Sequence, residues 1–321
     1  MRHQRILSAA PIDRTPIEIL QEVAPVEISP ATDEATLLSL LDRTIAIVAR
    51  GVEAKINGRI IEAASELRVI GRPGAGYDTV DIDAATRRKI PVIYAPVSGF
   101  AVSEGALALL LALVKKIPFC DGIVKSGEWR KRYEFSTGDM AEHTLGIIGL
   151  GRIGAGLARL AQPFEMTILG YDPVVTQEQA KAMGVQLVTL QELLQKSDYV
   201  SIHIPLSEET TGFINRQRIA QMKRGAILIN TARGAIIENL DILAEALESG
   251  QLSAVGLDVF PTEPPDVSHR LFSDPRFVCA PHMLGVSTLA MERIYRSMAT
   301  DMVAVLRGKQ PKFCVNPEVL S

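Results

Sequence analysis

Three side chains suited to proton exchange and anion binding each follow a short apolar run in the second half of the chain. Arg233 ends "GAILINTAR", Glu263 lies in "GLDVFPTEPP", and His282 lies in "VCAPHMLGVS". An arginine can hold a carboxylate through two hydrogen bonds, and a histidine can exchange a proton near neutral pH. A carboxylate beside an imidazole orients it and stabilises its charged form. Together these types suit hydride transfer to a 2-keto acid, with His282 as the proton donor.

Each of these residues also has an ordinary explanation. Arg233 could be a salt-bridged surface arginine, Glu263 a helix-start carboxylate beside Pro264, and His282 a solvated loop histidine. Arg50, after "AIVA", is a further cation. It could reach a substrate carboxylate or phosphate, or it could have a structural role alone.

A glycine-rich segment, "GIIGLGRIGAGLARL" at 146–160, could bind a cofactor. Gly149, Gly151 and Gly154 form the pattern G-x-G-x-x-G between an apolar strand and a helix. The first glycine permits a tight turn, the second lets a pyrophosphate approach the backbone, and the third lets helix and strand pack closely. The helix start also favours the pyrophosphate charge. The segment predicts dinucleotide binding, although such a fold can also bind another adenine ligand or none.

Asp172, in "GYDP", ends the next apolar run and lies 18 residues beyond Gly154 (172 − 154). A carboxylate near this spacing hydrogen-bonds the ribose hydroxyls of the cofactor and repels a 2′-phosphate. No arginine follows it directly, so the sequence favours NAD over NADP.

The elements that must position these residues are two series of alternating strands and helices. In the first series, strands are predicted at 5–9, 44–49, 67–72 and 91–95, and helices at 16–24, 33–41, 56–66 and 81–89. In the second series, six strands covered on both faces are predicted at 144–150, 166–172, 199–205, 225–232, 254–259 and 277–281. The alternation predicts an α/β fold with two doubly wound parallel sheets. Because the carboxyl ends of parallel strands face the ligand crevice, Arg233, Glu263 and His282 are expected to meet there.

A long apolar helix is predicted between the two series, at 101–123, and one more helix at 288–308. The first is apolar on most sides, which predicts burial between domains or subunits, or in an ordinary core.

The composition argues against several classes of protein. The net charge of −3 gives no basic surface for nucleic acid. Cys120, Cys279 and Cys314 show no CxxC spacing, so neither a disulfide framework nor a metal site is expected. The N-terminus has no apolar run of the length of a signal peptide core, and the most apolar stretch, 106–114, is too short to span a membrane. A cytoplasmic protein with no membrane or nucleic-acid partner is expected.

These motifs resemble those of the D-isomer-specific 2-hydroxyacid dehydrogenase family, which includes D-3-phosphoglycerate dehydrogenases, glyoxylate and hydroxypyruvate reductases and D-lactate dehydrogenases. The segments "TLGIIGLGRIG", "SIHIPLSEETTGFIN", "LINTARGAIIENLDILAEAL", "GLDVFPTEPP" and "APHMLG" occur together and in order. The resemblance extends from "LRVIGRPGAGYDTVDIDAA" to "TLAMERI". It implies an NAD-dependent oxidoreductase that interconverts a small 2-hydroxy acid and its 2-keto acid, with 3-phosphoglycerate or glyoxylate and hydroxypyruvate as candidate substrates.

The resemblance also implies roles for individual residues. Arg233 would bind substrate, Glu263 would pair with His282, and His282 would donate the proton. The implied cofactor-binding residues are Gly149, Gly151, Arg152, Ile153, Gly154, Asp172, His203, Pro205, Thr210, Thr231, Ala232, Arg233, Asp258, His282 and Gly285, with Asp258 at the nicotinamide carboxamide. Ala75 and Gly76 match the loop whose amides hold the substrate carboxylate.

For the whole chain, the resemblance implies a Rossmann NAD-binding domain, 102–284, inserted into a flavodoxin-like substrate-binding domain made of 1–101 and 285–321. It also implies a homodimer, which would explain the apolar helix 102–117. Leu284 replaces a smaller residue, Ser287 replaces a threonine, and the segment 95–106 is one residue short. Since that segment faces the substrate, the substrate stays open. A regulatory C-terminal extension is not expected.

A second function is compatible with the same residues. It is that of an NAD(H)-sensing binding protein, like the transcriptional corepressors that resemble this family and can retain Arg233, Glu263 and His282. Oxidation of NADH by a panel of keto acids would distinguish the two functions.

Overall fold

The computed structural model describes residues 4–51 and 53–320, which fall into two compact units. Unit 1 is built from the chain up to Ser98 and from Ser287 onwards, and unit 2 spans Gly99–Val286. Within the described part of the chain, no helix is long and apolar enough to cross a membrane.

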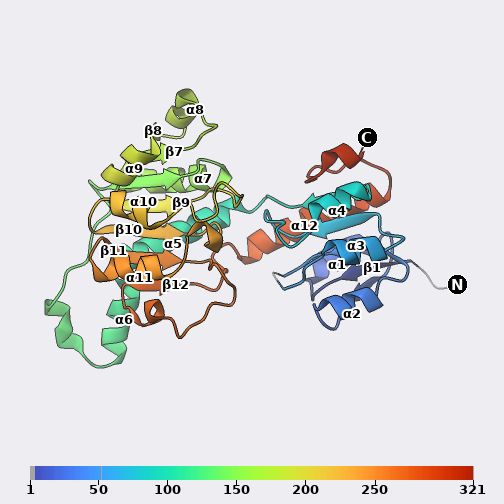
Figure 1. Cartoon of the computed structure of the whole chain (residues 1–321), viewed down its shortest axis with the longest axis horizontal. Coiled ribbons are helices and arrows are strands. Elements are labelled where there is room, and N and C mark those ends of the chain that lie inside the picture. Colours follow the sequence, from blue (N-terminus) through green and yellow to red (C-terminus); the bar gives the residue numbers. More distant parts are fainter. Residues whose placement is uncertain (1–3, 52, 321) are drawn as a thin grey trace. The chain divides into compact units, whose positions relative to one another are not determined.

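Unit 1 contains a five-stranded parallel sheet in the order β2-β1-β3-β4-β5 (Figure 1). Its strands are β1 (Arg5–Ser8), β2 (Val26–Ile28), β3 (Thr44–Val48), β4 (Val69–Arg72) and β5 (Val92–Tyr94). Its helices are α1 (Arg14–Leu20), α2 (Glu34–Ser39), α3 (Gly58–Ala63), α4 (Ile82–Arg87) and α12 (Thr288–Leu306), with a final 3-10 turn η5 (Pro317–Leu320). This strand order is that of flavodoxin-like folds.

The sheet of unit 1 is covered on both faces because successive side chains of each strand point to opposite sides. Leu7 packs in a cluster with residues of α2, α3 and α4, whereas Ile6 packs in a cluster with α1 and α12. The segment after α12 closes the edge of β5, where Val315 donates its amide to Val92 and the buried Asn316 accepts from the Val92 amide. The first and last parts of the chain therefore share one core.

Unit 2 contains a seven-stranded parallel sheet in the order β12-β11-β10-β9-β6-β7-β8 (Figure 1). Its strands are β6 (Thr144–Ile148), β7 (Thr167–Tyr171), β8 (Gln186–Leu187), β9 (Tyr199–Ile202), β10 (Ala226–Asn230), β11 (Leu252–Leu257) and β12 (Phe277–Cys279). Its α-helices are α5 (Gly99–Val114), α6 (Ile117–Lys125), α7 (Arg152–Ala161), α8 (Gln177–Ala182), α9 (Leu190–Lys196), α10 (Arg216–Gln221) and α11 (Asp241–Glu248). Its 3-10 turns are η1 (Trp129–Tyr133), η2 (Gln162–Phe164), η3 (Gly234–Ile236) and η4 (Arg270–Ser273).

The two parallel sheets confirm the predicted fold class, with two kinds of correction. The strands β2 and β8 were not predicted, so the count of six strands in the second series is wrong. Both are short edge strands, and β8 has only two residues, too few for a hydrophobic period to show.

The single helix predicted at 101–123 is also wrong. The chain breaks at Lys116, whose φ of 51° is left-handed, and α6 begins at Ile117. Pro118 has no amide hydrogen to donate to Val114, and its ring would clash with that carbonyl, so one helix cannot continue through this point. The buried face of α5 packs against α7, β10 and β11 within unit 2. This face therefore lies in an ordinary core.

Candidate active site

The glycine loop joins β6 to α7 and leaves open space at one position only. A Cβ on Gly149, where φ is +94°, would lie 2.7 Å from the His203 carbonyl oxygen, and a Cβ on Gly154 would lie 1.9 Å from the Gly149 carbonyl oxygen. A Cβ on Gly151, the residue before α7, would have nothing within 4 Å. The outer two glycines are therefore required by the protein's own packing. Gly151 instead faces a space that a pyrophosphate at the helix start can fill.

Asp172 follows β7 and faces this loop. Its Oδ2 accepts a hydrogen bond from the Leu150 amide at 2.8 Å, and its Oδ1 accepts from the Val174 amide at 2.9 Å. Oδ1 also accepts from the Val175 amide at 3.2 Å, whereas Oδ2 keeps a second lone pair that can accept from a ribose hydroxyl. The carboxylate thus links the end of the second strand of unit 2 to the glycine loop.

Two buried polar atoms at the ends of β9 and β10 have no hydrogen-bond partner among the described residues. They are Nδ1 of His203 and Oγ1 of Thr231. The other ring nitrogen of His203 lies 2.7 Å from Oγ of Ser201, and desolvation lowers the pKa of His203 to about 3. A neutral imidazole and a hydroxyl that lack partners suit a polar ligand at these strand ends. Together with the open space at Gly151, they fit a bound dinucleotide.

The side chain of Asn230, a buried residue that the sequence analysis missed, forms hydrogen bonds with the backbone of the turn that carries Arg233. Oδ1 of Asn230 accepts from the Ala232 amide at 2.9 Å, and its Nδ2 donates to the Arg233 carbonyl at 2.8 Å. Gly234 has no room for a side chain, because a Cβ there would lie 1.9 Å from the carbonyl carbon of Phe260. The Arg233 turn therefore packs on the segment after β11. An amide residue at the end of an apolar strand was the available sequence signal.

Asp258, directly after β11, organises the loop that bears His282. It is only 3% exposed, and its carbonyl oxygen accepts from the His282 amide at 2.8 Å. Its side chain accepts from the Met283 amide at 2.8 Å and from the Leu284 amide at 3.2 Å. Desolvation raises the pKa of Asp258, while these two amides oppose the shift. Its predicted contact with the nicotinamide carboxamide stays a prediction.

His282 and Glu263 are in direct contact. Nδ1 of His282 lies 2.8 Å from Oε2 of Glu263, whose Oε1 accepts from the Phe260 amide at 3.0 Å. The side chains are 39% and 23% exposed. With Nδ1 turned to the carboxylate, Nε2 is the atom free to exchange a proton. His282 has a left-handed φ of 57°, which is uncommon outside glycine and fixes the direction of the ring.

Two residues that depart from the family pattern have local explanations. Leu284 packs beside Gly105 of α5, where a Cβ would lie 2.6 Å from Cβ of Leu284. Oγ of Ser287 accepts from the Ala290 amide at 3.2 Å and so caps α12. The larger residue at 284 is therefore accommodated by a glycine, and the hydroxyl at 287 has a structural role.

The remaining predicted residues lie at strand ends and loops of their own units. Within unit 2, Arg152 and Ile153 begin α7, the hydroxyl of Thr210 donates to the Pro205 carbonyl at 2.7 Å, and Gly285 follows Leu284. Within unit 1, Arg50 follows β3, while Ala75 and Gly76 lie in the loop after β4. Unit 2 thus joins Asp258, Glu263 and the His282 loop by direct contacts, packs the Arg233 turn on the segment after β11, and also contains the glycine loop.

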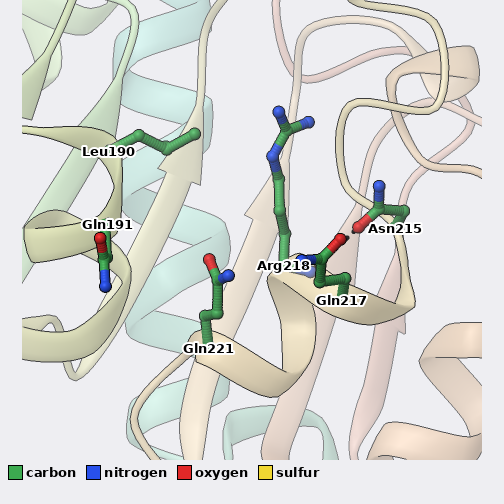
Figure 2. Close-up of a pocket in the computed structure, with 6 residues that line it drawn as sticks. All are labelled: Leu190, Gln191, Asn215, Gln217, Arg218 and Gln221. Carbon is green, nitrogen blue, oxygen red and sulfur yellow. Dashed lines mark hydrogen bonds between the residues drawn. The ribbon is translucent and has the colours of Figure 1, made fainter.

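One cavity of about 340 Å³ lies elsewhere on unit 2 (Figure 2). Its lining comes from α9 and α10 and the residue before α10, and consists of Leu190, Gln191, Asn215, Gln217, Arg218 and Gln221. None of these is a predicted site residue, so this cavity takes no part in the site.

The fold and these side chains define a class of protein: a dinucleotide-binding α/β protein with a histidine–carboxylate pair at its strand ends. The family model for the D-isomer specific 2-hydroxyacid dehydrogenase, NAD binding domain, matches residues 107–283. The chain belongs to the D-isomer specific 2-hydroxyacid dehydrogenase family, and this part of it is the NAD-binding domain.

Named relatives agree with this family. The chain is 39% identical to a D-3-phosphoglycerate dehydrogenase of Methanocaldococcus jannaschii over 97% of this chain and 59% of that protein. It is 38% identical to a glyoxylate reductase of Korarchaeum cryptofilum over 83% of this chain and 81% of that protein. A crystal structure of D-lactate dehydrogenase from Aquifex aeolicus, complexed with NAD and lactic acid, is 27% identical, with a TM-score of 0.86, and the match covers 98% of this chain and 99% of that chain. The chain thus spans little more than half the length of its phosphoglycerate dehydrogenase relative.

Proposed function

We propose that this chain is an NAD-dependent D-2-hydroxyacid dehydrogenase that acts as a reductase of a small 2-keto acid. The observation that carries the proposal is the 2.8 Å contact between His282 and Glu263, in the same unit as the glycine loop. Proton donation needs an imidazole of this kind, with one nitrogen held by a carboxylate and the other free, whereas a binding protein can retain the pair without using it.

In this proposal each side chain has one task in the reduction. Bound NADH supplies a hydride to the carbonyl carbon of the substrate. Arg233 binds the substrate carboxylate and keto oxygen through its guanidinium fork. His282 donates the proton on Nε2 to the keto oxygen and is then reprotonated from solvent. Glu263 stabilises the charged imidazole before transfer and holds its Nδ1 hydrogen.

The cofactor would lie along the strand ends of unit 2. Gly151, Arg152 and Ile153 would contact the pyrophosphate, and Asp172 would accept from the ribose hydroxyls, which favours NAD over NADP. The other proposed contacts are Gly149, Gly154, His203, Pro205, Thr210, Thr231, Ala232, Asp258 and Gly285. Comparable efficiency with NADPH and NADH would contradict the placement of Asp172.

For the substrate, unit 1 would supply Ala75, Gly76 and Arg50. The amides of Ala75 and Gly76 suit a carboxylate, and Arg50 suits a carboxylate or a phosphate. The names of the relatives support 3-phosphoglycerate or glyoxylate as the substrate. We therefore assign unit 1 to substrate binding and unit 2 to the cofactor.

The test is a panel of glyoxylate, hydroxypyruvate, 3-phosphohydroxypyruvate and pyruvate with NADH, followed by absorbance. At least one should be reduced, and His282→Asn should lower kcat by about 10²- to 10⁴-fold while NADH still binds. His143→Asn, a change at a half-buried histidine beside β6 that stacks on Tyr199 and has no proposed role in the reaction, is the matched control and should leave kcat unchanged. Full turnover by His282→Asn would refute the proposed role of His282. If NADH binds but no keto acid is reduced, the chain is instead an NAD(H)-sensing protein.

We further propose a homodimer formed through the segment 117–135 of unit 2. This segment, α6 and η1 with their connecting turn, projects from the rest of the unit (Figure 1). It leaves large apolar side chains in solvent, among them Trp129 at 58% and Tyr133 at 79% exposure. Exposed apolar side chains that lie together often mark a protein–protein interface. In this proposal the segment 117–135 of a second copy of the chain covers them. Light scattering should show a dimer that Trp129→Ala with Tyr133→Ala dissociates, and an unchanged mass would refute this surface.

The cytoplasm is the compartment that we propose. Cys120, Cys279 and Cys314 are all free thiols. Free thiols are stable in a reducing compartment. Fractionation that recovers the protein with secreted or membrane material would contradict this assignment.

A further inference from the structure

Tyr295 is a tyrosine in the middle of α12 whose polar end has no evident structural use. The residue is 0% exposed and belongs to the cluster that joins α1 and α12 to the sheet of unit 1. Its hydroxyl is buried and makes no hydrogen bond with the described residues. Burial raises the pKa of Tyr295, so the phenol is neutral throughout the range in which the protein works. A buried hydroxyl without a partner is costly, and such a group calls for an explanation.

The charged group that lies against this phenol is Arg50. Its guanidinium carbon lies 5.9 Å from the centroid of the Tyr295 ring, within the range of a cation–π contact. Arg50 is half-buried just beyond the carboxyl end of β3. Among residues 4–51 and 53–320, no carboxylate pairs with its side chain. Tyr295 is therefore the contact residue of this cation: the ring lies within cation–π range, and the guanidinium is near enough to the phenol to lower its pKa against the effect of burial.

We propose that Tyr295 is a positioning residue that holds the Arg50 guanidinium at the carboxyl edge of the unit 1 sheet and thereby sets the affinity for an oxyanion of the substrate. The inference rests on the proposed function, in which Arg50 binds a substrate carboxylate or phosphate. Tyr295 itself is inaccessible to the substrate, so it acts through Arg50.

The physical reason is preorganisation. An exposed arginine has many rotamers, and it must lose that freedom when it binds an anion. A ring that already fixes the guanidinium lessens this loss without neutralising the charge, as a carboxylate partner would. Arg72, at the end of β4, adds a second positive charge near the phenol, and Asp13 a negative one. The buried position of Tyr295 makes the contact stronger than one in solvent, because less water competes for the cation.

The test is a double-mutant cycle on ligand binding, read by calorimetry with the full chain in the presence of NADH. The ligands are 3-phosphoglycerate, which carries a carboxylate and a phosphate, and D-glycerate, which carries the carboxylate alone. Neither can be oxidised while NADH occupies the cofactor site. Tyr295→Leu should weaken binding about 3- to 30-fold, whereas Tyr295→Phe, which keeps the ring, should stay within about twofold of the unchanged protein. In an Arg50→Ala background, Tyr295→Leu should have no further effect.

Met302→Ala is the matched control, because Met302 lies in α12 and packs in the same cluster as Tyr295. It should lower stability without weakening either ligand. Weakened binding of 3-phosphoglycerate alone would show that Arg50 holds the phosphate, and weakened binding of both ligands would show that it holds the carboxylate. The proposal is overturned if the losses of Tyr295→Leu and Arg50→Ala add, if Met302→Ala weakens binding equally, or if the unchanged protein binds neither ligand. A chain that binds these ligands but reduces no keto acid would refute the proposed function and leave the cycle interpretable.

Discussion

Replacing Glu263 by glutamine is the sharpest test of the site, because it changes one charge and almost no volume. The carboxylate lies 2.8 Å from Nδ1 of His282. A hydrogen bond between charged groups contributes about 1.5–3 kcal/mol when it is buried. Since the two side chains are 39% and 23% exposed, solvent screens the pair and about 1.4 kcal/mol is the better figure. That energy corresponds to about a tenfold change in a rate or an equilibrium constant.

The carboxylate stabilises the protonated imidazole, which donates the proton in reduction and forms in the transition state of oxidation. Because a substitution cannot change the equilibrium constant of the reaction, Glu263→Gln should lower kcat/KM in both directions by the same factor, about tenfold, at any one pH.

The assay is kcat/KM at one fixed pH for NADH oxidation with the best keto acid of the panel, and for NAD reduction with the matching hydroxy acid. Glu238→Gln, an exposed carboxylate in the same unit, is the control and should change neither rate. If Glu263→Gln leaves both rates unchanged, the proposed electrostatic role of the carboxylate is refuted.

Three other perturbations have clear expected outcomes. Gly151→Ala should weaken NADH binding at least tenfold in a fluorescence titration with an unchanged melting temperature, whereas Gly154→Ala, whose Cβ would meet backbone at 1.9 Å, should cost about 3 kcal/mol or more in stability. If both changes had the same effect on NADH binding and on stability, the proposal that the open space at Gly151 holds the pyrophosphate would be contradicted. The folded protein keeps His203 neutral down to about pH 3, whereas the unfolded chain protonates it below about 6.5. The free energy of unfolding should therefore decrease as the pH is lowered from about 6.5 to about 3, and it should not change above this range. Between pH 7 and pH 5 this loss is about 2 kcal/mol, and denaturant melts of His203→Gln should lack it. Gly105→Ala would place a Cβ 2.6 Å from Cβ of Leu284 and so displace the loop that carries His282. It should destabilise unit 2 by about 1–3 kcal/mol and lower kcat. Unchanged stability and kcat would show that the loop accommodates the added methyl group.

The sequence was sufficient for features that repeat along the chain or occur as motifs. Buried parallel strands show as continuous apolar runs, which is why β3, β6 and β10 were predicted within two residues of their observed bounds. The edge strands β2 and β8 were missed because neither is an apolar run: β2 contains Glu27 and β8 is only Gln186 and Leu187, whereas β5 and β12 are as short but apolar. The break at Lys116 was missed although Pro118 was visible, because the apolar pattern continues across it.

At the site, the motifs predicted which residues matter better than how they are held. The contact between His282 and Glu263 follows from strand order and loop chemistry, both of which the sequence carries. The supports of the site involve residues far apart in the chain, such as Asp258 with the Met283 and Leu284 amides. A buried hydrogen bond of this kind produces no repeating pattern of residue types from which it could be predicted. The same holds for Asn230, whose role depends on the turn above it.

The interrupted sequence of unit 1 has a consequence for synthesis. Its core needs α12, whose Tyr295 and Met298 pack with strand residues made near the beginning of the chain, such as Ile6. Unit 2 is continuous from Gly99 to Val286. During translation, unit 2 can therefore complete its core while the first 98 residues still expose apolar surface on the face that α12 will cover. On that face the core of unit 1 is therefore completed only after α12 has been made, which is later than unit 2 can complete its own core.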